Sequence, residues 1–422
     1  MDLDYDPMSP RWRDDPYPVY RALRDRAPVY FAERSRAFCV TRYDDVQAVL
    51  NDPETFSSRA MFTVLMNGGE EGMPSLRDWQ TLKALVRLLI ASRARPLAFL
   101  NGRNLIASDG AVHTGMRGVV NRGFTPRRVR AWEPRIRELV DECMAKLHGS
   151  EPFDVVRDLA IPLPVTIIAE MLGIEPERRD DFKRWSDTTI HYISGAGRAN
   201  RFADELTRAI AELTGYLRRI AKQRRRQPAD DLISVLVSTQ DGEDGLTDVE
   251  VIMFVNLLLV AGNETTTNLI GNAVNALLDH PEQLERVCAD PSLVPSLVEE
   301  TLRYDAPIQV IFRTATRDAE IAGTRIPKDS WVAPILGSAN RDERRFDDPD
   351  RFDAGRNPQG HVGFGFGKHF CLGASLARLE ATAALSAVVP ELARLRKRHA
   401  KVERIDSFLV RGPSRLELVP AA

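Results

Sequence analysis

The chain has 422 residues, of which 43% are hydrophobic and 28% are charged, and its formal net charge at pH 7 is −2. A nearly balanced charge disfavours a nucleic-acid binder, which usually carries a basic excess or a basic tail. The four cysteines lie far apart and form no CxxC pair, which disfavours a disulfide framework or a zinc site and fits a reducing cytosol. They are Cys39, Cys143, Cys288 and Cys371.

The sequence predicts no membrane anchor. Residues 1–18 are acidic and proline-rich and lack the pattern of a signal peptide. The longest apolar run, residues 251–261, is interrupted by Asn256 and is too short to span a bilayer. We therefore expect a soluble, cytoplasmic protein with enough apolar residues for a sizeable core.

The N-terminal part combines strand and helix signals. Residues 29–33 and 37–43 are candidate strands of a hairpin, and a helix over Asp44 to Leu50 follows. Residues 61–103 begin irregularly and then contain an amphipathic stretch over 81–93. Three interpretations of that stretch stay open: a helix packed on the body of the protein, a lid over a substrate channel, and contact with a partner or a membrane surface.

The rest of the chain is mainly helical in its apolar spacing, with short strand signals near the end. The helical segments are 128–147, 162–174, 201–223 and 248–278, and the strand signals are 310–316, 319–323, 331–336 and 415–419. We find no linker rich in glycine, serine or proline that would divide the chain. The sequence therefore predicts a mainly α protein with a small β portion, in a single domain over residues 1–422.

The segment from Phe364 to Glu380, FGFGKHFCLGASLARLE, contains the most specific signal. Its glycine-rich turn places Cys371 at the start of a helix, where backbone N–H groups and the helix dipole favour a thiolate. Gly367 and Gly373 let the backbone pass close to a flat ligand, and Phe364 can shield the sulfur from water. A free cysteine outside such a pattern is usually a buried structural residue.

This segment resembles the haem-binding loop of the cytochrome P450 family, particularly of its bacterial members. The resemblance implies haem b (iron protoporphyrin IX) with Cys371 as the axial iron ligand, whose electron donation favours O–O cleavage. It also implies that His369 contacts a haem propionate, and that the fold is a triangular prism-like helical bundle around one haem. Residues 61–103 would then be an enlarged insertion over the substrate pocket of one catalytic domain.

Residues 257–272, LLLVAGNETTTNLIGN, resemble the family's oxygen-activating helix. Glycine within a helix costs about 1 kcal/mol relative to alanine, and a close approach of Ala261 and Gly262 to haem and dioxygen would explain its presence. The resemblance implies that Thr265 steadies the bound oxygen and that Glu264 helps to deliver protons. The alternative is a solvated acid beside an ordinary helical threonine.

Glu300 and Arg303 place opposite charges at i and i+3 on one helix face. Such a pair alone is common on surface helices. Its position upstream of the cysteine segment resembles the family's structural Glu–Arg pair, and Arg356 is the candidate third member. A buried network of this kind can fix the chain that leads to the cysteine segment.

Three further residues match the family's propionate partners. His113 and Arg117 lie at i and i+4, which suits two cations that bind one propionate, and Arg313 matches a strand arginine that binds another. Each is an ordinary residue when taken in isolation. Ser108–Gly110 departs from the Asp-Pro-Pro of many bacterial relatives, which leaves the path into this helix open.

The resemblance implies a haem-thiolate monooxygenase that inserts one oxygen atom from O₂ into a C–H bond. The candidate pocket residues are mostly apolar, which favours a terpenoid, steroid, fatty acid or polyketide-like substrate that Gln309 could orient. They are Leu257, Val260, Ala261, Ile308, Gln309, Val310, Ile311, Phe408, Leu409 and Val410.

Electrons must come from a partner, because no GxGxxG, flavin or iron–sulfur motif is present. We expect a small acidic ferredoxin with its NAD(P)H-dependent reductase, or else a flavodoxin, on a basic face of Lys368, Arg378 and residues 394–404. Two alternatives remain, a haem-thiolate peroxygenase or isomerase and a non-enzymatic haem sensor. The Glu264–Thr265 pair disfavours both.

Overall fold

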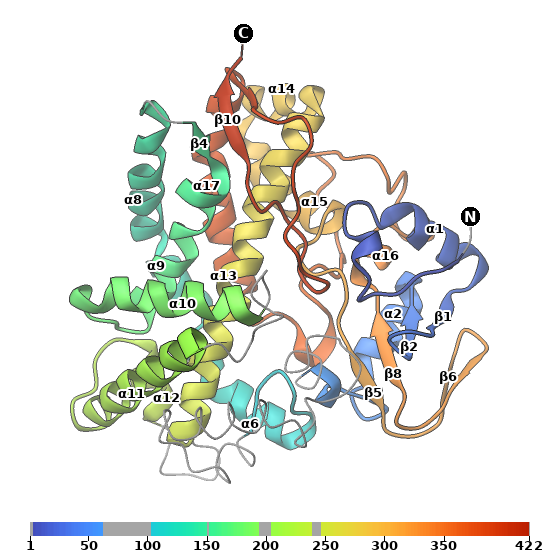
Figure 1. Ribbon diagram of the computed structural model, residues 1–422, viewed down its shortest axis with the longest axis horizontal. Helices are drawn as coiled ribbons and strands as arrows, with labels where there is room; N and C mark the ends of the chain where they lie inside the picture. The colour runs from blue at the N-terminus through green and yellow to red at the C-terminus, as the bar shows by residue number, and fades with distance from the viewer. Residues whose placement is uncertain (1–2, 62–102, 150–151, 194–203, 239–245, 422) are drawn as a thin grey trace. The chain divides into compact units, whose positions relative to one another are not determined.

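The computed structural model describes residues 3–61, 103–149, 152–193, 204–238 and 246–421. Helices predominate and the strands are short, which confirms the predicted fold class (Figure 1). Two compact units alternate along the chain. The first consists of Met1–Phe56, Pro126–Pro164 and Glu264–Ala422, and the second of Ser57–Thr125 and Val165–Asn263. The prediction of one catalytic domain over residues 1–422 stays a prediction.

The first unit contains most of the helices that the structure describes. They are α1 (Tyr17–Arg26), α2 (Tyr43–Asn51), α7 (Pro126–Ala131), α8 (Glu133–Met144), α14 (Pro281–Ala289), α15 (Val294–Tyr304), α16 (Leu336–Ala339) and α17 (Ala374–Leu392). Helix α17 contacts α7, α8, α14 and α15, and side chains such as Ala381, Leu385 and Val388 on it are buried. It is therefore the central helix of this unit.

The strands of the first unit form three small sheets. The largest has the order β1-β2-β8-β5-β3, and the others have the orders β4-β10-β9 and β6-β7. The strands are β1 (Val29–Ala32), β2 (Ala37–Val40), β3 (Phe56–Ser57), β4 (Phe153–Asp154), β5 (Arg313–Ala315), β6 (Ala319–Ile321), β7 (Thr324–Ile326), β8 (Trp331–Pro334), β9 (Leu395–Lys397) and β10 (Glu417–Pro420).

The predicted hairpin is confirmed. Strands β1 and β2 are antiparallel, with Val29 opposite Val40 and Ala32 opposite Ala37, and β2 continues the sheet in parallel with β8. Between them Arg36 adopts a left-handed conformation, φ 49°, that closes the turn. The four predicted strand signals contain β5, β6, β8 and β10, whereas the sequence did not predict β3, β4, β7 or β9.

A core cluster joins the large sheet to α2 and to the chain just before the cysteine segment. Val46 and Leu50 of α2, Val332 of β8 and Val362 are buried together in it. Helix α2 also contacts the short 3-10 helix Gly367–His369. The cysteine segment is thus packed against α2 and this core cluster of the first unit.

The second unit is helical. Its helices are α6 (Gly110–Asn121), α9 (Pro162–Met171, which begins in the first unit), α10 (Arg179–Ile193), α11 (Asp204–Arg226) and α12 (Leu232–Val237). Helix α11 contacts α10 and α12, and α12 contacts α6. Arg103 forms a bidentate ion pair with Glu250, with Nε–Oε1 and Nη2–Oε2 distances of 2.5 and 3.1 Å. The amphipathic stretch 81–93 lies outside the described residues, so all three interpretations of it stay open.

Helix α13 (Asp248–Asp279) runs through both units. Within the described part of the chain it is the one helix that is long and apolar enough to cross a membrane by length and composition. Its polar side chains bind backbone of the first unit instead. Thr267 Oγ1 donates to the carbonyl of Ala160 at 2.9 Å, and Asn272 Nδ2 donates to those of Asp305 and Arg411 at 2.8 and 3.0 Å. These contacts are those of a core helix.

Candidate functional site

The cysteine loop, residues 362–373, is closed by backbone hydrogen bonds. Cys371 N–H donates to the carbonyl of Phe364 at 2.9 Å, and Gly365 N–H donates to that of Val362 at 2.9 Å. The Cys371 side chain is partly exposed and forms no disulfide. Helix α17, 19 residues long, begins at Ala374, so the sulfur lies close to a helix N-terminus as predicted.

The glycines of the loop serve different purposes. Gly367 has φ +68°, and a Cβ there would lie 3.0 Å from the carbonyl oxygen of Leu50, so only glycine fits without strain. Gly373 has an ordinary φ of −84°, and a Cβ there would meet no other atom within 4 Å. The space beside Gly373 is open, which is compatible with a flat ligand next to the loop.

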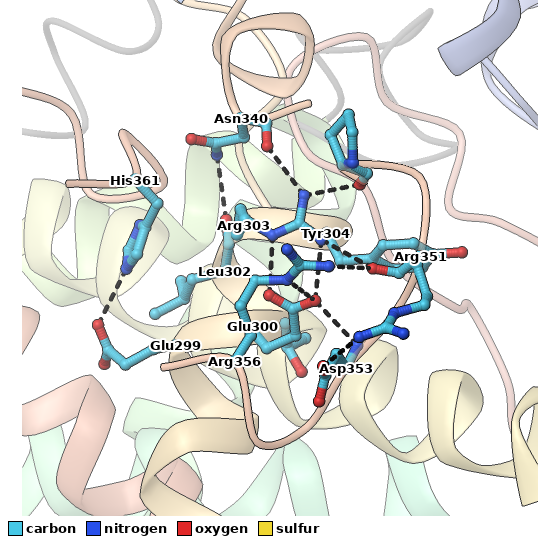
Figure 2. A network of polar contacts seen from close by, with 12 residues as sticks. Glu299, Glu300, Leu302, Arg303, Tyr304, Asn340, Arg351, Asp353, Arg356 and His361 are labelled. Carbon is cyan, nitrogen blue, oxygen red and sulfur yellow. Dashed lines mark hydrogen bonds and ion pairs between the residues drawn. The ribbon is translucent and has the colours of Figure 1, made fainter. Parts of the chain in front are cut away.

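The three residues of the predicted Glu–Arg network do meet (Figure 2). Arg303 binds both carboxylate oxygens of Glu300 at 2.8 Å, and Arg356 Nε lies 3.2 Å from Glu300 Oε1. Asp353 N–H donates to the same oxygen at 3.0 Å. Glu300 and Arg303 are 0% exposed. Because every contact partner is charged or polar, the buried carboxylate is compensated.

The two arginines also hold the irregular chain over residues 340–356. Arg303 donates to the carbonyls of Asn340, Pro349 and Arg351 at 2.7–3.1 Å. Arg356 donates to the carbonyls of Asp347, Asp348 and Arg351 at 2.5–3.1 Å. Carbonyls that a helix or sheet would otherwise satisfy are bound by guanidinium groups instead.

Asn340 extends this network to the cysteine loop, a role that the sequence did not predict. Its Nδ2 donates to the carbonyl of Leu302 at 3.1 Å, and its Oδ1 accepts from Val362 N–H at 2.7 Å. The end of α15 and the start of the cysteine loop are therefore joined through one buried amide, as Figure 2 shows for Asn340 and Leu302.

A second carboxylate of α15, Glu299, was also missed. Its Oε2 lies 2.9 Å from His361 Nε2. Arg378 Nε donates to Oε1 of Glu299 at 2.6 Å, and Arg378 Nη2 donates to Oε2 at 2.9 Å. The Arg378 guanidinium lies 4.6 Å from the centre of the Phe364 ring. Burial acts to raise the pKa of Glu299, but the hydrogen bonds and charges of Arg378 and His361 outweigh it and lower the pKa to about 2.

The two other predicted cofactor partners of the first unit lie on defined elements. Arg313 is the first residue of β5, is 4% exposed, and donates from Nη1 to the carbonyl of Phe312 at 3.0 Å. His369 ends the 3-10 helix of the cysteine loop and is partly exposed.

The predicted oxygen-activating residues lie on α13. Glu264 and Thr265, in its first-unit stretch, are partly buried, and the Glu264 carbonyl accepts from Asn268 Nδ2 at 2.7 Å. In the second-unit stretch a Cβ on Gly262 would lie 2.8 Å from Ile168 Cδ1 of α9. Close packing of two helices is thus one reason for glycine at this position, beside the predicted approach of a ligand.

Helix α6 carries His113 and Arg117 one turn apart, His113 buried and Arg117 partly exposed. The unusual residues ahead of it define its start. Asp109 Oδ2 accepts from Ser57 Oγ at 2.7 Å and from Ser58 N–H at 2.9 Å, and Gly110 adopts φ +61°. The glycine supplies a backbone turn into the helix that a proline could not make.

The predicted substrate segments of the first unit lie side by side. Ile308 and Val410 form an antiparallel bridge, and Gln309 N–H donates to the carbonyl of Leu409 at 3.4 Å. Phe408 is partly exposed and its ring lies 6.3 Å from that of Phe312. Residues 308–310 and 408–410 therefore belong to one surface of this unit.

Two residues of that surface are less accessible to a substrate than the sequence indicated. Val310 is 1% exposed and pairs with Ile335, so it belongs to the core. Gln309 is also buried, and its Nε2 donates to the carbonyl of Ala306 at 2.8 Å. Within the described residues its Oε1 accepts no hydrogen bond, so one acceptor remains for a ligand or for water.

Most cations of the predicted docking face have an acidic partner. Arg378 binds Glu299, and within residues 394–404 several ion pairs form: Arg394–Glu391, Lys397–Asp279, Arg398–Glu417, Lys401–Asp14 and Arg404–Asp305. Lys368, in the cysteine loop, is exposed. The net positive charge that this face could offer a partner is smaller than the sequence indicated.

Comparison with known proteins decides the family. The Cytochrome P450 family model matches residues 83–419. The chain belongs to the cytochrome P450 family. Since the match begins at residue 83, it includes part of the segment that the sequence analysis set apart.

Three relatives illustrate the likeness to other cytochromes P450. The chain is 37% identical over 421 residues to the vitamin D(3) 25-hydroxylase of Pseudonocardia autotrophica (98% of this chain, 95% of the relative). It is 38% identical over 402 residues to the cytochrome P450 monooxygenase PikC of Streptomyces venezuelae (93% and 88%). It aligns with the crystal structure of CYP109E1 from Bacillus megaterium in complex with testosterone at 33% identity and a TM-score of 0.81 (97% and 100%).

These matches confirm the predicted fold. They also identify this cytochrome P450 as a monooxygenase, which is an oxidoreductase with a haem-thiolate cofactor. The residues present fit that cofactor. Cys371 offers a partly exposed thiol at a helix N-terminus, and the space beside Gly373 is open. No group of three His, Cys, Asp or Glu side chains forms a metal site in the described ranges, and haem needs only one protein ligand on this side.

Proposed function

We propose that the protein inserts one oxygen atom from O₂ into a C–H bond of a hydrophobic small molecule, with haem b as cofactor and Cys371 as the axial iron ligand. The observation that carries this proposal is the closed cysteine loop at the start of α17, fixed by the Glu300 network. Bound haem supplies dioxygen activation, which a thiolate ligand favours. The chain itself contributes in four ways.

The first contribution is to keep the sulfur a thiolate. The N-terminal N–H groups of α17 favour negative charge at Cys371. We assign to Phe364, whose carbonyl accepts from Cys371 N–H, the role of shielding the sulfur from water. A dry, oriented thiolate is the ligand that the reaction needs.

The second contribution is to bind the propionates. Arg313 and His369 of the first unit, and His113 and Arg117 of the second, would donate charge-assisted hydrogen bonds to these carboxylates. The support is chemical. Each is a cation or a neutral donor on a defined element, and Arg313 and His113 are buried.

The third contribution is to move protons. We assign this to Glu264, whose carboxyl group can give up a proton, and to Thr265, whose hydroxyl can pass it on. Both lie on one turn of α13, with the Glu264 carbonyl held by Asn268. Ala261, one turn earlier, has a small side chain that would leave room for a ligand, whereas Gly262 packs against Ile168 of α9.

The fourth contribution is an apolar pocket, to which we assign Leu257 and Val260 of α13 together with Ile308, Gln309, Phe408 and Leu409. Their side chains are mainly aliphatic or aromatic, so the substrate is hydrophobic. Relatives that hydroxylate vitamin D(3) or are crystallised with testosterone favour a steroid-like molecule over a terpenoid, fatty acid or polyketide-like one. Gln309 Oε1 would accept a hydrogen bond from a substrate hydroxyl.

Electrons would come from a ferredoxin and its NAD(P)H-dependent reductase in the cytoplasm. The chain carries no flavin or iron–sulfur motif of its own, and Lys368 beside the cysteine is exposed to an acidic partner. We assign the first contact to Lys368, because the other cations of this face are largely paired.

The test is a substrate screen on the haem-loaded protein. Testosterone, vitamin D(3), a terpene alcohol and palmitic acid are titrated, and the low-to-high spin shift measures binding. Turnover is then measured with O₂, NADPH, a ferredoxin and its reductase, and separately with hydrogen peroxide. Hydroxylated product with O₂ and NADPH supports the proposal. Product with peroxide alone would favour a peroxygenase, and no product under either condition would favour a sensor.

A further inference from the structure

The cysteine loop is held at both ends by one carboxylate. Glu299 accepts from His361, which precedes the loop, and from Arg378, which follows it on α17. The segment between these two residues contains Cys371. Because Glu299 lies on α15, both the beginning and the end of this segment are fixed to one residue of that helix.

Glu299 and its neighbour Glu300 serve different parts of the chain. Glu300 binds Arg303 and Arg356, which hold residues 340–356, whereas Glu299 binds only residues that flank the cysteine loop. The Glu299 side chain is 18% exposed. Since its pKa is lowered to about 2, it stays ionised in the range where the protein would work.

A short chain of contacts links Glu299 to the backbone of Cys371. The Arg378 guanidinium lies over the Phe364 ring at 4.6 Å, and the Phe364 carbonyl accepts from Cys371 N–H at 2.9 Å. A guanidinium at this place favours negative charge on the sulfur and electron gain by a metal bound to it, and the Glu299 carboxylate opposes that effect. The two opposite charges are thus connected to the Cys371 backbone through a single residue, Phe364.

We propose that Glu299 is a positioning residue for the cysteine loop, and that the Glu299–Arg378 pair sets the charge balance beside Cys371 and thereby the reduction potential of the bound haem iron. This inference rests on the proposed role of Cys371 as the iron ligand. It adds a function for two residues that the Glu300 network does not include.

The reduction potential of the haem-loaded protein distinguishes an electrostatic role of the Glu299–Arg378 pair from a merely structural one. Glu299→Gln leaves the Arg378 charge unopposed and raises the potential, Arg378→Met removes that charge and lowers it, and the double variant returns close to wild type. Arg378→Lys keeps the charge and stays closer to wild type than Arg378→Met. Glu391→Gln and Arg394→Met, from an exposed pair at the far end of α17, are controls and leave the potential unchanged.

Hydrogen exchange in the same haem-loaded variants tests the positioning. Glu299→Gln speeds exchange at the amides of Gly365, Phe370 and Cys371, whose hydrogen bonds close the loop, and Glu299→Asp restores part of the protection. Potentials that shift in the same direction in both single variants, or unchanged exchange, would overturn the inference. A wild-type CO complex without the thiolate signature would instead overturn the proposed function, whatever the exchange shows.

Discussion

Arg303 binds both carboxylate oxygens of Glu300 at 2.8 Å, and neither side chain is exposed to solvent. A buried pair of this kind adds little net stability by itself, because both charges lose their hydration. The structural role of the pair follows from the backbone carbonyls that Arg303 and Arg356 bind along residues 340–356. The pair therefore fixes a stretch of chain that has no regular secondary structure.

Replacing Glu300 with Gln should lower the free energy of unfolding by about 3–5 kcal/mol, because Arg303 then stays buried without its counter-charge. Denaturant unfolding followed by circular dichroism measures this. The exposed pair Arg325–Asp318 is the control, and Arg325→Met should leave the free energy of unfolding nearly unchanged. A Glu300→Gln protein as stable as the control would show that the network is not compensating a buried charge.

Glu380 predicts an unusual pH dependence of stability. It is 2% exposed on α17, and within the described residues no group donates to its Oε1. Burial raises the pKa of Glu380 from 4.5 to about 8. The folded protein therefore binds one more proton than the unfolded chain between these pH values, and stability falls as the pH rises through that window.

Glu380→Gln should remove this loss. The variant and the wild type should be about equally stable near pH 4.5, and the variant should be more stable by a few kcal/mol above pH 8, where the buried wild-type carboxyl is ionised. Thermal unfolding at a series of pH values makes the comparison. Parallel pH profiles for the two proteins would mean that the carboxyl is not the group that titrates.

Thr265→Ala should separate proton delivery from haem binding. The variant should load haem and consume NADPH, but direct more of the electrons to hydrogen peroxide, because a positioned proton donor contributes about 10²–10⁴-fold to the assisted step. Thr265→Ser, which keeps the hydroxyl, should retain most of the coupling. The ratio of product to NADPH consumed is the measurement, and equal ratios for wild type and Thr265→Ala would refute the role.

The secondary structure that the sequence predicted well has local causes. The β1–β2 hairpin is encoded by two adjacent apolar runs and a short turn, and α11 by a long amphipathic pattern. Strands β3 and β4 have only two residues each, too few for an alternating pattern. Their pairing depends on distant partners, such as β4 on β10.

The same distinction applies to the site. Glu300, Arg303 and Arg356 were predicted because a short motif and its place in the family specify them. Glu299 was not, because its partners His361 and Arg378 come from distant parts of the chain. The burial of Glu380 likewise depends on how neighbouring helices surround α17, and α17 is apolar on nearly all sides, so no polar face marked the position in advance.

The most direct test of the account is the spectrum of the dithionite-reduced CO complex. Wild-type protein should show the strongly red-shifted Soret band of thiolate ligation. Cys371→Ser should lose that band, and Cys288→Ser, which changes another partly exposed cysteine, should keep it. A folded, fully haem-loaded wild-type protein with an unshifted band, or a Cys371→Ser variant that retains the shifted band, would contradict the assignment of Cys371 as the iron ligand.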